Sequence, residues 1–167
     1  MSHYPEIKVD GVFLVRGTVP IEGVRVHPLR RIADERGTVF HMLRKSDPHF
    51  MEFGEIYFSS VYAGVVKGWH KHDEMSLHYA CVHGRIKCAL YDDREGSPSK
   101  GSLMEVYLGP DSYHLLVVPP LVWNGFKGMG PENIVANACT HSHDPKRSFR
   151  LPPDDPSIGY DWATKHH

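Results

Sequence analysis

Thirteen prolines and fifteen glycines are spread along this chain of 167 residues and divide it into short apolar segments. Proline and glycine interrupt helices and favour turns, so a chain divided in this way has little room for long helices. Some of the segments alternate apolar with polar residues, as residues 85–91 do. Such alternation is typical of β-strands that bury one face. The sequence therefore predicts many short strands.

Several segments carry this strand pattern. They are residues 12–15, 37–43, 55–62, 65–72, 77–82, 85–91, 102–108, 115–118 and 134–139. Short strands at this spacing are typical of a β-sandwich or a barrel. The chain has the length of an ordinary domain, so we expect a single domain over residues 1–167.

Charge and cysteine content exclude several classes of protein. A formal net charge of −1 and a pI near 6.9 give no basic surface for nucleic acid or an anionic membrane. No apolar stretch approaches the roughly 20 residues of a membrane span. Three cysteines, Cys81, Cys88 and Cys139, are too few and wrongly spaced for a disulfide framework. We therefore expect a cytoplasmic protein that binds neither nucleic acid nor membrane.

A His-x-His pair ends the apolar segment at residues 65–72. Residues i and i+2 of a strand project to the same face, so His70 and His72 can converge on one pocket. The residues alone are also consistent with two solvated surface imidazoles. The segments that follow favour a functional site.

The arrangement around this pair resembles a cupin jelly roll. Gly64, His70, His72 and Gly84 fit the first cupin motif, whereas the second motif is degraded at residues 119–124. The resemblance implies an all-β jelly-roll sandwich or barrel with short peripheral helices. In a metal-binding cupin, the ligands would be His70, His72, His78 and Asn124.

A more specific resemblance covers about residues 30–162 and rests on five ordered landmarks. They are residues 34–37, residues 64–70, residues 91–101, residues 118–120 with 124–126, and residues 155–162. In this order and spacing they resemble the dTDP-4-dehydrorhamnose 3,5-epimerase family and its sugar-nucleotide relatives. The resemblance implies a cupin-like homodimer that acts on a nucleotide-diphosphate sugar without a cofactor.

The chemistry of such a reaction explains the residues. Hydrogens on the carbons beside a ketone are acidic because the carbanion delocalises into an enolate. Histidine, with a reference pKa near 6.5, is largely neutral and still basic at neutral pH. By resemblance His70 is the base, and Asp155 is the carboxylate that orients it. From its residue type alone, Asp155 is equally consistent with a turn residue before Pro156.

The resemblance assigns further residues to the substrate. Lys67 stands where the family usually has arginine and would meet negative charge on the enolate or a phosphate. Arg36 would contact the nucleotide diphosphate across a dimer interface, and Glu55 would contact the base. The alternative for each is an ordinary solvated charge. Tyr57 would stack on a nucleobase or hexose, although aromatic residues on strands more often lie in a core or interface.

Other positions depart from the family pattern. Leu77 or His78 stands where the family has a lysine, and Ser142 or His143 stands where it has a tyrosine that protonates the sugar. His143 or Tyr160 would then supply that proton. Asn124 replaces the histidine of a His-Gly-Phe turn. We expect Asn124 and His72 to contact the substrate, with His72 orienting the sugar.

The main prediction is a nucleotide-sugar epimerase that acts at C3, C5 or both on a 4-keto-6-deoxyhexose in polysaccharide biosynthesis. A 3,4-ketoisomerase is an alternative, because related ketoisomerases carry a His-x-His pair. A metal-binding cupin with the four ligands named above is another alternative. A non-catalytic sugar-binding protein is the last.

Overall fold

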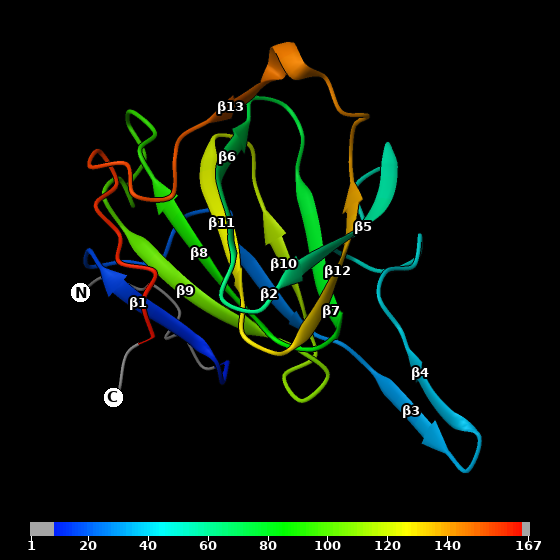
Figure 1. The fold of residues 1–167 in the computed structure, drawn as a ribbon. Coiled ribbons are helices and arrows are strands. Elements are labelled where there is room, and N and C mark those ends of the chain that lie inside the picture. Colours follow the sequence, from blue (N-terminus) through cyan, green and yellow to red (C-terminus); the bar gives the residue numbers. More distant parts are fainter. Residues whose placement is uncertain (1–8, 165–167) are drawn as a thin grey trace.

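The computed structural model describes residues 9–164, which fold almost entirely into β-strands (Figure 1). The strands are β1 (Val12–Arg16), β2 (Arg25–Pro28), β3 (Arg31–Asp34), β4 (Gly37–Phe40), β5 (Glu55–Tyr62), β6 (Val66–His72), β7 (Leu77–His83), β8 (Ile86–Asp92), β9 (Leu103–Leu108), β10 (His114–Val118), β11 (Val122–Gly128), β12 (Glu132–Cys139) and β13 (Ser148–Arg150). The sequence predicted short peripheral helices, but within these residues the structure has one 3-10 turn, η1 (Pro145–Arg147).

Two antiparallel sheets face each other. One has the strand order β1-β9-β8-β11-β6-β13, and the other has the order β2-β10-β7-β12-β5. Strands that are distant in sequence are therefore neighbours in both sheets. The predicted all-β sandwich is confirmed.

Alternation along the strands builds the core between the sheets. On β8, the side chains of Ile86, Cys88 and Leu90 point inward and are at most 2% exposed. Ala89 and Tyr91 belong to a second apolar cluster, on the outer face of the same sheet. A strand buried on both faces shows no simple hydrophobic alternation, and β8 is buried almost throughout.

The segment at residues 151–162, called the tail strap below, covers this outer face. Its apolar side chains pack on the strand residues Trp69, Ala89, Leu103 and Trp123, and they are Leu151, Ile158, Tyr160 and Trp162. The indole rings of Trp162 and Trp69 have centroids 5.0 Å apart, and both indole nitrogens donate to the carbonyl of Pro153. The Arg16 guanidinium donates to the carbonyls of Ile158 and Gly159, which fastens the strap to β1.

Strand β11 was not predicted, because the Asn124-Gly125 pair is a common turn signal. In the structure it pairs with β6 on one side and β8 on the other. A Cβ atom added at Gly125 would lie 2.9 Å from the Cα of Gly68 on β6. Glycine at position 125 thus serves close backbone approach within a strand rather than a turn.

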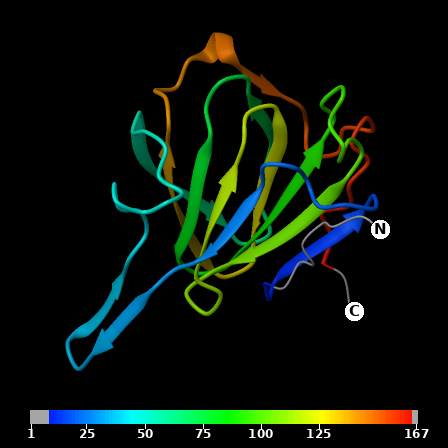
Figure 2. The same cartoon turned by 180° about the vertical axis from the view of Figure 1, so that it is seen from behind.

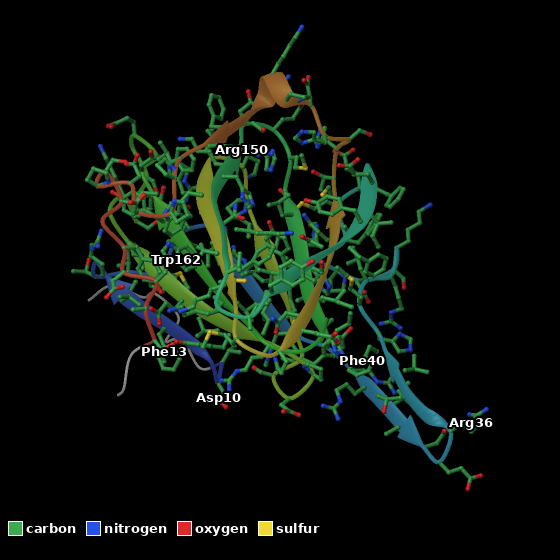
Figure 3. The ribbon with its side chains drawn as sticks, viewed as in Figure 1. Asp10, Phe13, Arg36, Phe40, Arg150 and Trp162 are labelled. Carbon is green, nitrogen blue, oxygen red and sulfur yellow. The ribbon has the colours of Figure 1, made fainter. Side chains whose placement is uncertain are left out.

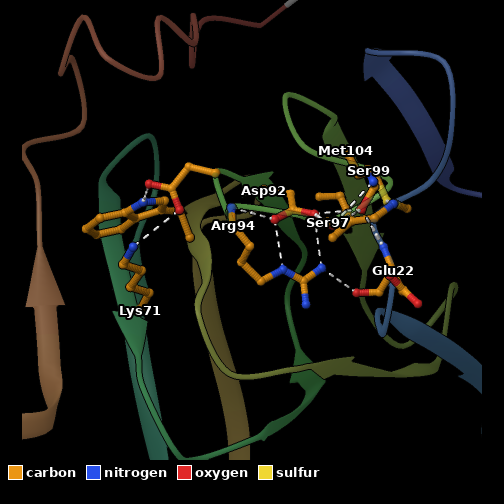
Figure 4. A network of polar contacts seen from close by, with 10 residues as sticks. Glu22, Lys71, Asp92, Arg94, Ser97, Ser99 and Met104 are labelled. Atoms are coloured by element: carbon orange, nitrogen blue, oxygen red, sulfur yellow. Dashed lines mark hydrogen bonds and ion pairs between the residues drawn. The ribbon is translucent and has the colours of Figure 1, made fainter.

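A buried carboxylate holds the loop after β8. Asp92 is fully buried and accepts hydrogen bonds from the guanidinium of Arg94 and the hydroxyls of Ser97 and Ser99 (Figure 4). Burial alone would raise the pKa of Asp92, but these hydrogen bonds outweigh burial and hold its pKa far below the usual range. Arg94 also donates to the carbonyl of Glu22, which ties the loop to the segment before β2.

The β3–β4 hairpin projects away from the sandwich in both views (Figures 1 and 2). Every residue of β3 is exposed, including Ile32, and Val39 on β4 is 56% exposed. Within residues 9–164, no helix is long and apolar enough to span a membrane.

Candidate active site

A cavity of about 500 Å³ lies between the two sheets. This volume is within the ordinary range for small-molecule sites. One wall comes from β5, β7 and β12, and the other comes from β6, β11, β13 and the start of the tail strap. The lining residues are Tyr57, Ser59, Val66, Lys67, Gly68, Trp69, His70, Tyr79, Phe126, Val135, Asn137, Arg150, Leu151 and Pro153.

His70 is placed in this cavity by three strands. It lies on β6, directly opposite Asn124 on β11 and opposite Arg150 on β13. Its Nε2 atom is 3.2 Å from the hydroxyl of Tyr79, which comes from β7 in the other sheet. The imidazole therefore contacts both sheets, and the prediction that His70 lies in a pocket agrees with the structure.

Tyr79 and Asn124 continue this contact. The Tyr79 hydroxyl donates to Asn124 Oδ1 at 3.0 Å, and Asn124 Nδ2 donates to the carbonyls of His70 and Val122. Tyr79 and Asn124 are 3% and 2% exposed, so water does not compete for these bonds. Sequence reasoning missed Tyr79, because a tyrosine inside an apolar strand reads as core.

Burial lowers the pKa of His70 to about 4, with further lowering from His72 and from the positive charge of Arg150. At neutral pH the imidazole is therefore uncharged and carries one free lone pair. A neutral imidazole in a cavity is a proton acceptor.

Two cations line the cavity, and among its described lining residues there is no carboxylate. Lys67 donates to the hydroxyl of Ser59 at 2.9 Å, and Arg150 is exposed beside His70. Figure 3 shows Arg150 on the sandwich itself, near β13. The cavity thus favours an anionic ligand. Sequence reasoning missed Arg150, because only the β6–β13 pairing brings it to His70.

Tyr57 faces the cavity from β5 and is 45% exposed. Its hydroxyl oxygen accepts a hydrogen bond from Asn137 Nδ2 at 2.9 Å, and the hydroxyl also makes a hydrogen-bond contact with the thiol of Cys139. Burial of part of the ring raises the pKa of Tyr57, so the phenol is protonated at neutral pH. Tyr57 therefore lines the cavity, and its stacking on a nucleobase or hexose stays a prediction.

The structure does not bring Asp155 to His70. The Asp155 carboxylate accepts hydrogen bonds from the backbone and hydroxyl of Ser157, two residues along the tail strap. These bonds lower the pKa of Asp155 within its own turn. The turn interpretation is the correct one, and Tyr79 occupies the place expected for a carboxylate.

Asn124 and Glu55 are not available to a ligand in the way predicted. The amide of Asn124 is used on both sides by the contacts described above, and the side chain is almost fully buried. Glu55 accepts a hydrogen bond from the backbone of His143 at 3.1 Å, outside the lining of the cavity. Both residues support the site instead of forming its surface.

His72 and His143 lie beside the cavity rather than in its lining. Their rings meet edge to face, with centroids 6.2 Å apart, while the rings of His70 and His72 are 6.1 Å apart. His72 lines a smaller cavity of about 260 Å³ with His141 and Ser142. Tyr160, the other predicted proton donor, hydrogen-bonds Glu105 under the tail strap.

Arg36 lies at the tip of the β3–β4 hairpin, away from the sandwich (Figure 3). Its guanidinium pairs with Asp34 in the same turn, which raises the pKa of Arg36. Within one copy of the chain, Arg36 is not part of the cavity lining. Its predicted contact with the diphosphate requires a second copy.

The predicted set of metal ligands does not converge. His78 belongs to the opposite face of β7 from Tyr79, and its Nδ1 atom is 3.0 Å from the carbonyl of Ala138. Asn124 is engaged as described. Across residues 9–164, no group of three or more His, Cys, Asp or Glu side chains is arranged to hold a metal ion. The metal-binding alternative is therefore wrong for this set.

Comparison with known proteins agrees with the motif pattern. The family model for dTDP-4-dehydrorhamnose 3,5-epimerase matches residues 18–167. The chain is similar to the probable low-salt glycan biosynthesis epimerase Agl13 of Haloferax volcanii, with 36% identity over 152 residues, covering 88% of this chain and 97% of that protein. It is also similar to the spore coat polysaccharide biosynthesis protein SpsL of Bacillus subtilis, with 32% identity over 148 residues, covering 87% and 98%.

Solved structures share the fold. The dTDP sugar isomerase from Desulfovibrio desulfuricans G20 superposes with a TM-score of 0.85 and 43% identity, covering 92% of this chain and 96% of that chain. NovW, a 4-keto-6-deoxy sugar epimerase from Streptomyces spheroides, has the same fold with a TM-score of 0.78 and 23% identity, covering 95% and 84%. The resemblance predicted from the sequence landmarks is confirmed.

Proposed function

Because the chain belongs to the dTDP-4-dehydrorhamnose 3,5-epimerase family and is therefore an isomerase, we propose that it epimerises a nucleotide-linked 4-keto-6-deoxyhexose at C3, C5 or both. The observation that carries the proposal is a neutral, partly buried imidazole in a cavity with two cations and, among its described lining residues, no carboxylate. A sugar ketone with an attached diphosphate fits this cavity, because the base can take a proton from the carbon beside the ketone and the two cations can bind the negative charge.

His70 takes the proton from the carbon beside the ketone. The C–H bond breaks, an N–H bond forms on the imidazole, and the electron pair moves into the enolate oxygen. Lys67 and Arg150 are the positive charges that meet the enolate or the diphosphate. Return of a proton to the opposite face of the carbon completes the inversion.

Tyr57 is the proton donor in this proposal. It is a protonated phenol on the wall formed by β5, whereas His70 belongs to the wall formed by β6. The proton of Tyr79 is engaged with Asn124, and neither His143 nor Tyr160 lines the cavity. A base and an acid on two facing sheets can remove a proton from one face of a sugar ring and deliver a proton to the other face.

The test is proton exchange in deuterated water. The protein is incubated with several nucleotide-linked 4-keto sugars, and NMR identifies the carbon that takes up deuterium. We expect exchange at C3 or C5 with inversion for at least one sugar. Movement of the carbonyl to C3 would instead identify a ketoisomerase, and absence of exchange with every sugar would overturn the proposal in favour of sugar binding alone.

The working form in this proposal is a homodimer. Its support is the β3–β4 hairpin, which presents Ile32 and Val39 to solvent, and the edge strand β5, whose outward Phe58 and Tyr62 are 66% and 78% exposed. Exposed apolar side chains beside an unpaired strand edge mark a surface for association. In the dimer, Arg36 reaches the diphosphate in the partner's cavity.

Light scattering tests the dimer directly. We expect a mass near twice the 19.0 kDa of the chain, and an Arg36→Ala variant that keeps this mass but binds substrate more weakly. A monomeric mass at working concentration would overturn both the dimer and the cross-subunit role of Arg36. An unchanged KM in the variant would overturn the role alone.

A further inference from the structure

We propose that Tyr79 and Asn124 form a neutral hydrogen-bond relay that holds His70 in the tautomer protonated at Nε2, so that Nδ1 is the atom that accepts the substrate proton. Tyr79 and Asn124 are positioning residues in this relay, because they act through His70. Its catalytic consequence rests on the proposed function, whereas the tautomer itself does not.

The relay begins with the orientation of the Asn124 amide. An amide nitrogen and oxygen are interchangeable in shape, so the hydrogen-bond partners must decide which is which. On one side the partners are the carbonyl oxygens of His70 at 3.1 Å and Val122 at 3.3 Å. Carbonyl oxygens only accept, so Nδ2 must lie on this side and Oδ1 must face Tyr79.

The orientation of Asn124 fixes the proton of Tyr79. Oδ1 only accepts, so the phenol must donate its hydrogen across the 3.0 Å contact with Asn124. Burial raises the pKa of Tyr79 well above its usual value, so this hydrogen is present at neutral pH. The phenol oxygen then has only lone pairs left for His70.

The Tyr79 oxygen in turn selects the tautomer of His70. An acceptor 3.2 Å from Nε2 requires that Nε2 carry the hydrogen. In a neutral imidazole the other nitrogen, Nδ1, then has the lone pair. His70 lines the cavity, and Nδ1 is the ring nitrogen that is not in contact with Tyr79.

Each member of the relay is held by a different strand. Asn124 and His70 are cross-strand partners on β11 and β6, and Tyr79 crosses from β7 in the facing sheet. Substrate binding in the cavity does not need to displace any of them, because Tyr79 and Asn124 are almost fully buried. The relay is therefore in place before substrate arrives.

A neutral relay differs from a carboxylate partner in one respect. A carboxylate orients the imidazole and also stabilises the imidazolium by its negative charge. Tyr79 and Asn124 supply orientation without that charge, so protonated His70 loses its proton readily to solvent and the neutral base is restored after each turnover.

The first experiment measures the tautomer in the free protein. Nitrogen-15 NMR on protein with labelled histidine distinguishes protonated from unprotonated ring nitrogens, and the His70→Asn variant assigns the signals of His70. We expect one tautomer, with hydrogen on Nε2, at about pH 7. Hydrogen on Nδ1, or an equal mixture of the two tautomers, would overturn the proposal.

The second experiment removes the phenol hydroxyl. In Tyr79→Phe, we expect His70 to populate both tautomers and kcat to fall by about 10- to 100-fold, with KM changed by less than about twofold. Tyr113→Phe is the matched control, since the hydroxyl of Tyr113 is buried and has no hydrogen-bond partner among the described residues. A Tyr79→Phe variant that keeps the single tautomer and full kcat would overturn the relay.

These measurements separate the relay from the proposed function. The NMR experiment uses no substrate, so its result stands even if no nucleotide-linked 4-keto sugar exchanges deuterium. Conversely, exchange in the wild-type protein together with hydrogen on Nδ1 would overturn the relay and leave the proposed function intact. If Tyr79→Phe does not fold, the wild-type tautomer alone decides.

Discussion

The two faces of strand β6 differ in almost every respect. On the outer face, Trp69 is 1% exposed and packs under the tail strap against Trp162, while it also contributes to the lining of the cavity. On the inner face, the adjacent His70 is held by hydrogen bonds in an open cavity. The outer face is apolar and closely packed, whereas the inner face combines polar groups with space for a ligand.

This difference separates stability from chemistry along one short strand. Packed aromatic rings lower the free energy of the folded chain by burying apolar surface. A partly buried imidazole facing an open cavity contributes little to packing, but it has the reactivity of a neutral base. Substitutions on the two faces should therefore give opposite results, and each prediction below tests that separation.

The largest effect is expected on the inner face. His70→Asn keeps a polar side chain of smaller size but removes the base, so turnover should fall by about 1,000-fold or more while the unfolding midpoint changes little. Steady-state kinetics and thermal unfolding of the same preparation check both parts. Normal turnover in this variant would contradict the assignment of His70 as base.

Trp162→Ala tests how much the packing on the outer face contributes to stability. It removes an indole that is 8% exposed and hydrogen-bonded to the carbonyl of Pro153, so it should destabilise the fold by about 3 kcal/mol. Turnover measured well below the unfolding midpoint should persist. Trp162→Phe is the control, since it keeps an aromatic ring and should cost less. A stable Trp162→Ala variant that has lost turnover would break the separation of the two faces.

The pH dependence of stability is expected to follow four histidines that are partly or fully buried. Burial is the main cause that lowers the pKa values of His27, His70, His72 and His78 from 6.5. Below about pH 6.5 the unfolded chain therefore binds more protons than the folded chain, so the free energy of unfolding decreases as pH falls. Urea unfolding between about pH 7.5 and pH 5 measures this, and a midpoint that does not change over that range would contradict it.

The smallest effect is expected from Arg150→Gln. Loss of this cation should raise KM by about tenfold, because one charge that meets the anionic substrate is removed. It should also raise the pKa of His70, because Arg150 is one of the groups that lower it. The acidic limb of the kcat/KM profile should then move to higher pH, and a shift to lower pH would contradict the role of Arg150. Phe149→Leu, on the neighbouring exposed side chain, is a suitable control.

Much of the fold could be predicted, because local patterning determines most strands. Alternating apolar residues predicted β8, and the apolar segment before His70 predicted β6. Strand β11 could not be read in this way, since Gly125 is required by the approach of β6, which is a contact between distant segments. The β3–β4 hairpin was predicted only in part, as its first strand lacks an apolar pattern.

The residues of the site show the same contrast between local sequence and contacts of distant segments. His70, Lys67 and Tyr57 were predicted and line the cavity. The His-x-His pattern on its strand indicated His70, whereas Lys67 was assigned from the family resemblance. Tyr79 and Arg150 were missed, since their roles depend on which strands become neighbours in space. Asp155 was misplaced for a different reason: the family resemblance assigned it to His70, whereas the local Asp-Pro signal indicated the turn that holds its carboxylate.

The tail strap also sets the order in which the cavity is completed during synthesis. His70 and its cross-strand partner Asn124 are made well before Leu151 and Pro153, which form part of the cavity wall, and before Trp162, which covers Trp69. A nascent chain that ends at residue 150 has its base but lacks the wall beside it, and the outer face of β6 is still bare. The cavity that holds substrate is thus finished only after the ribosome has added the strap.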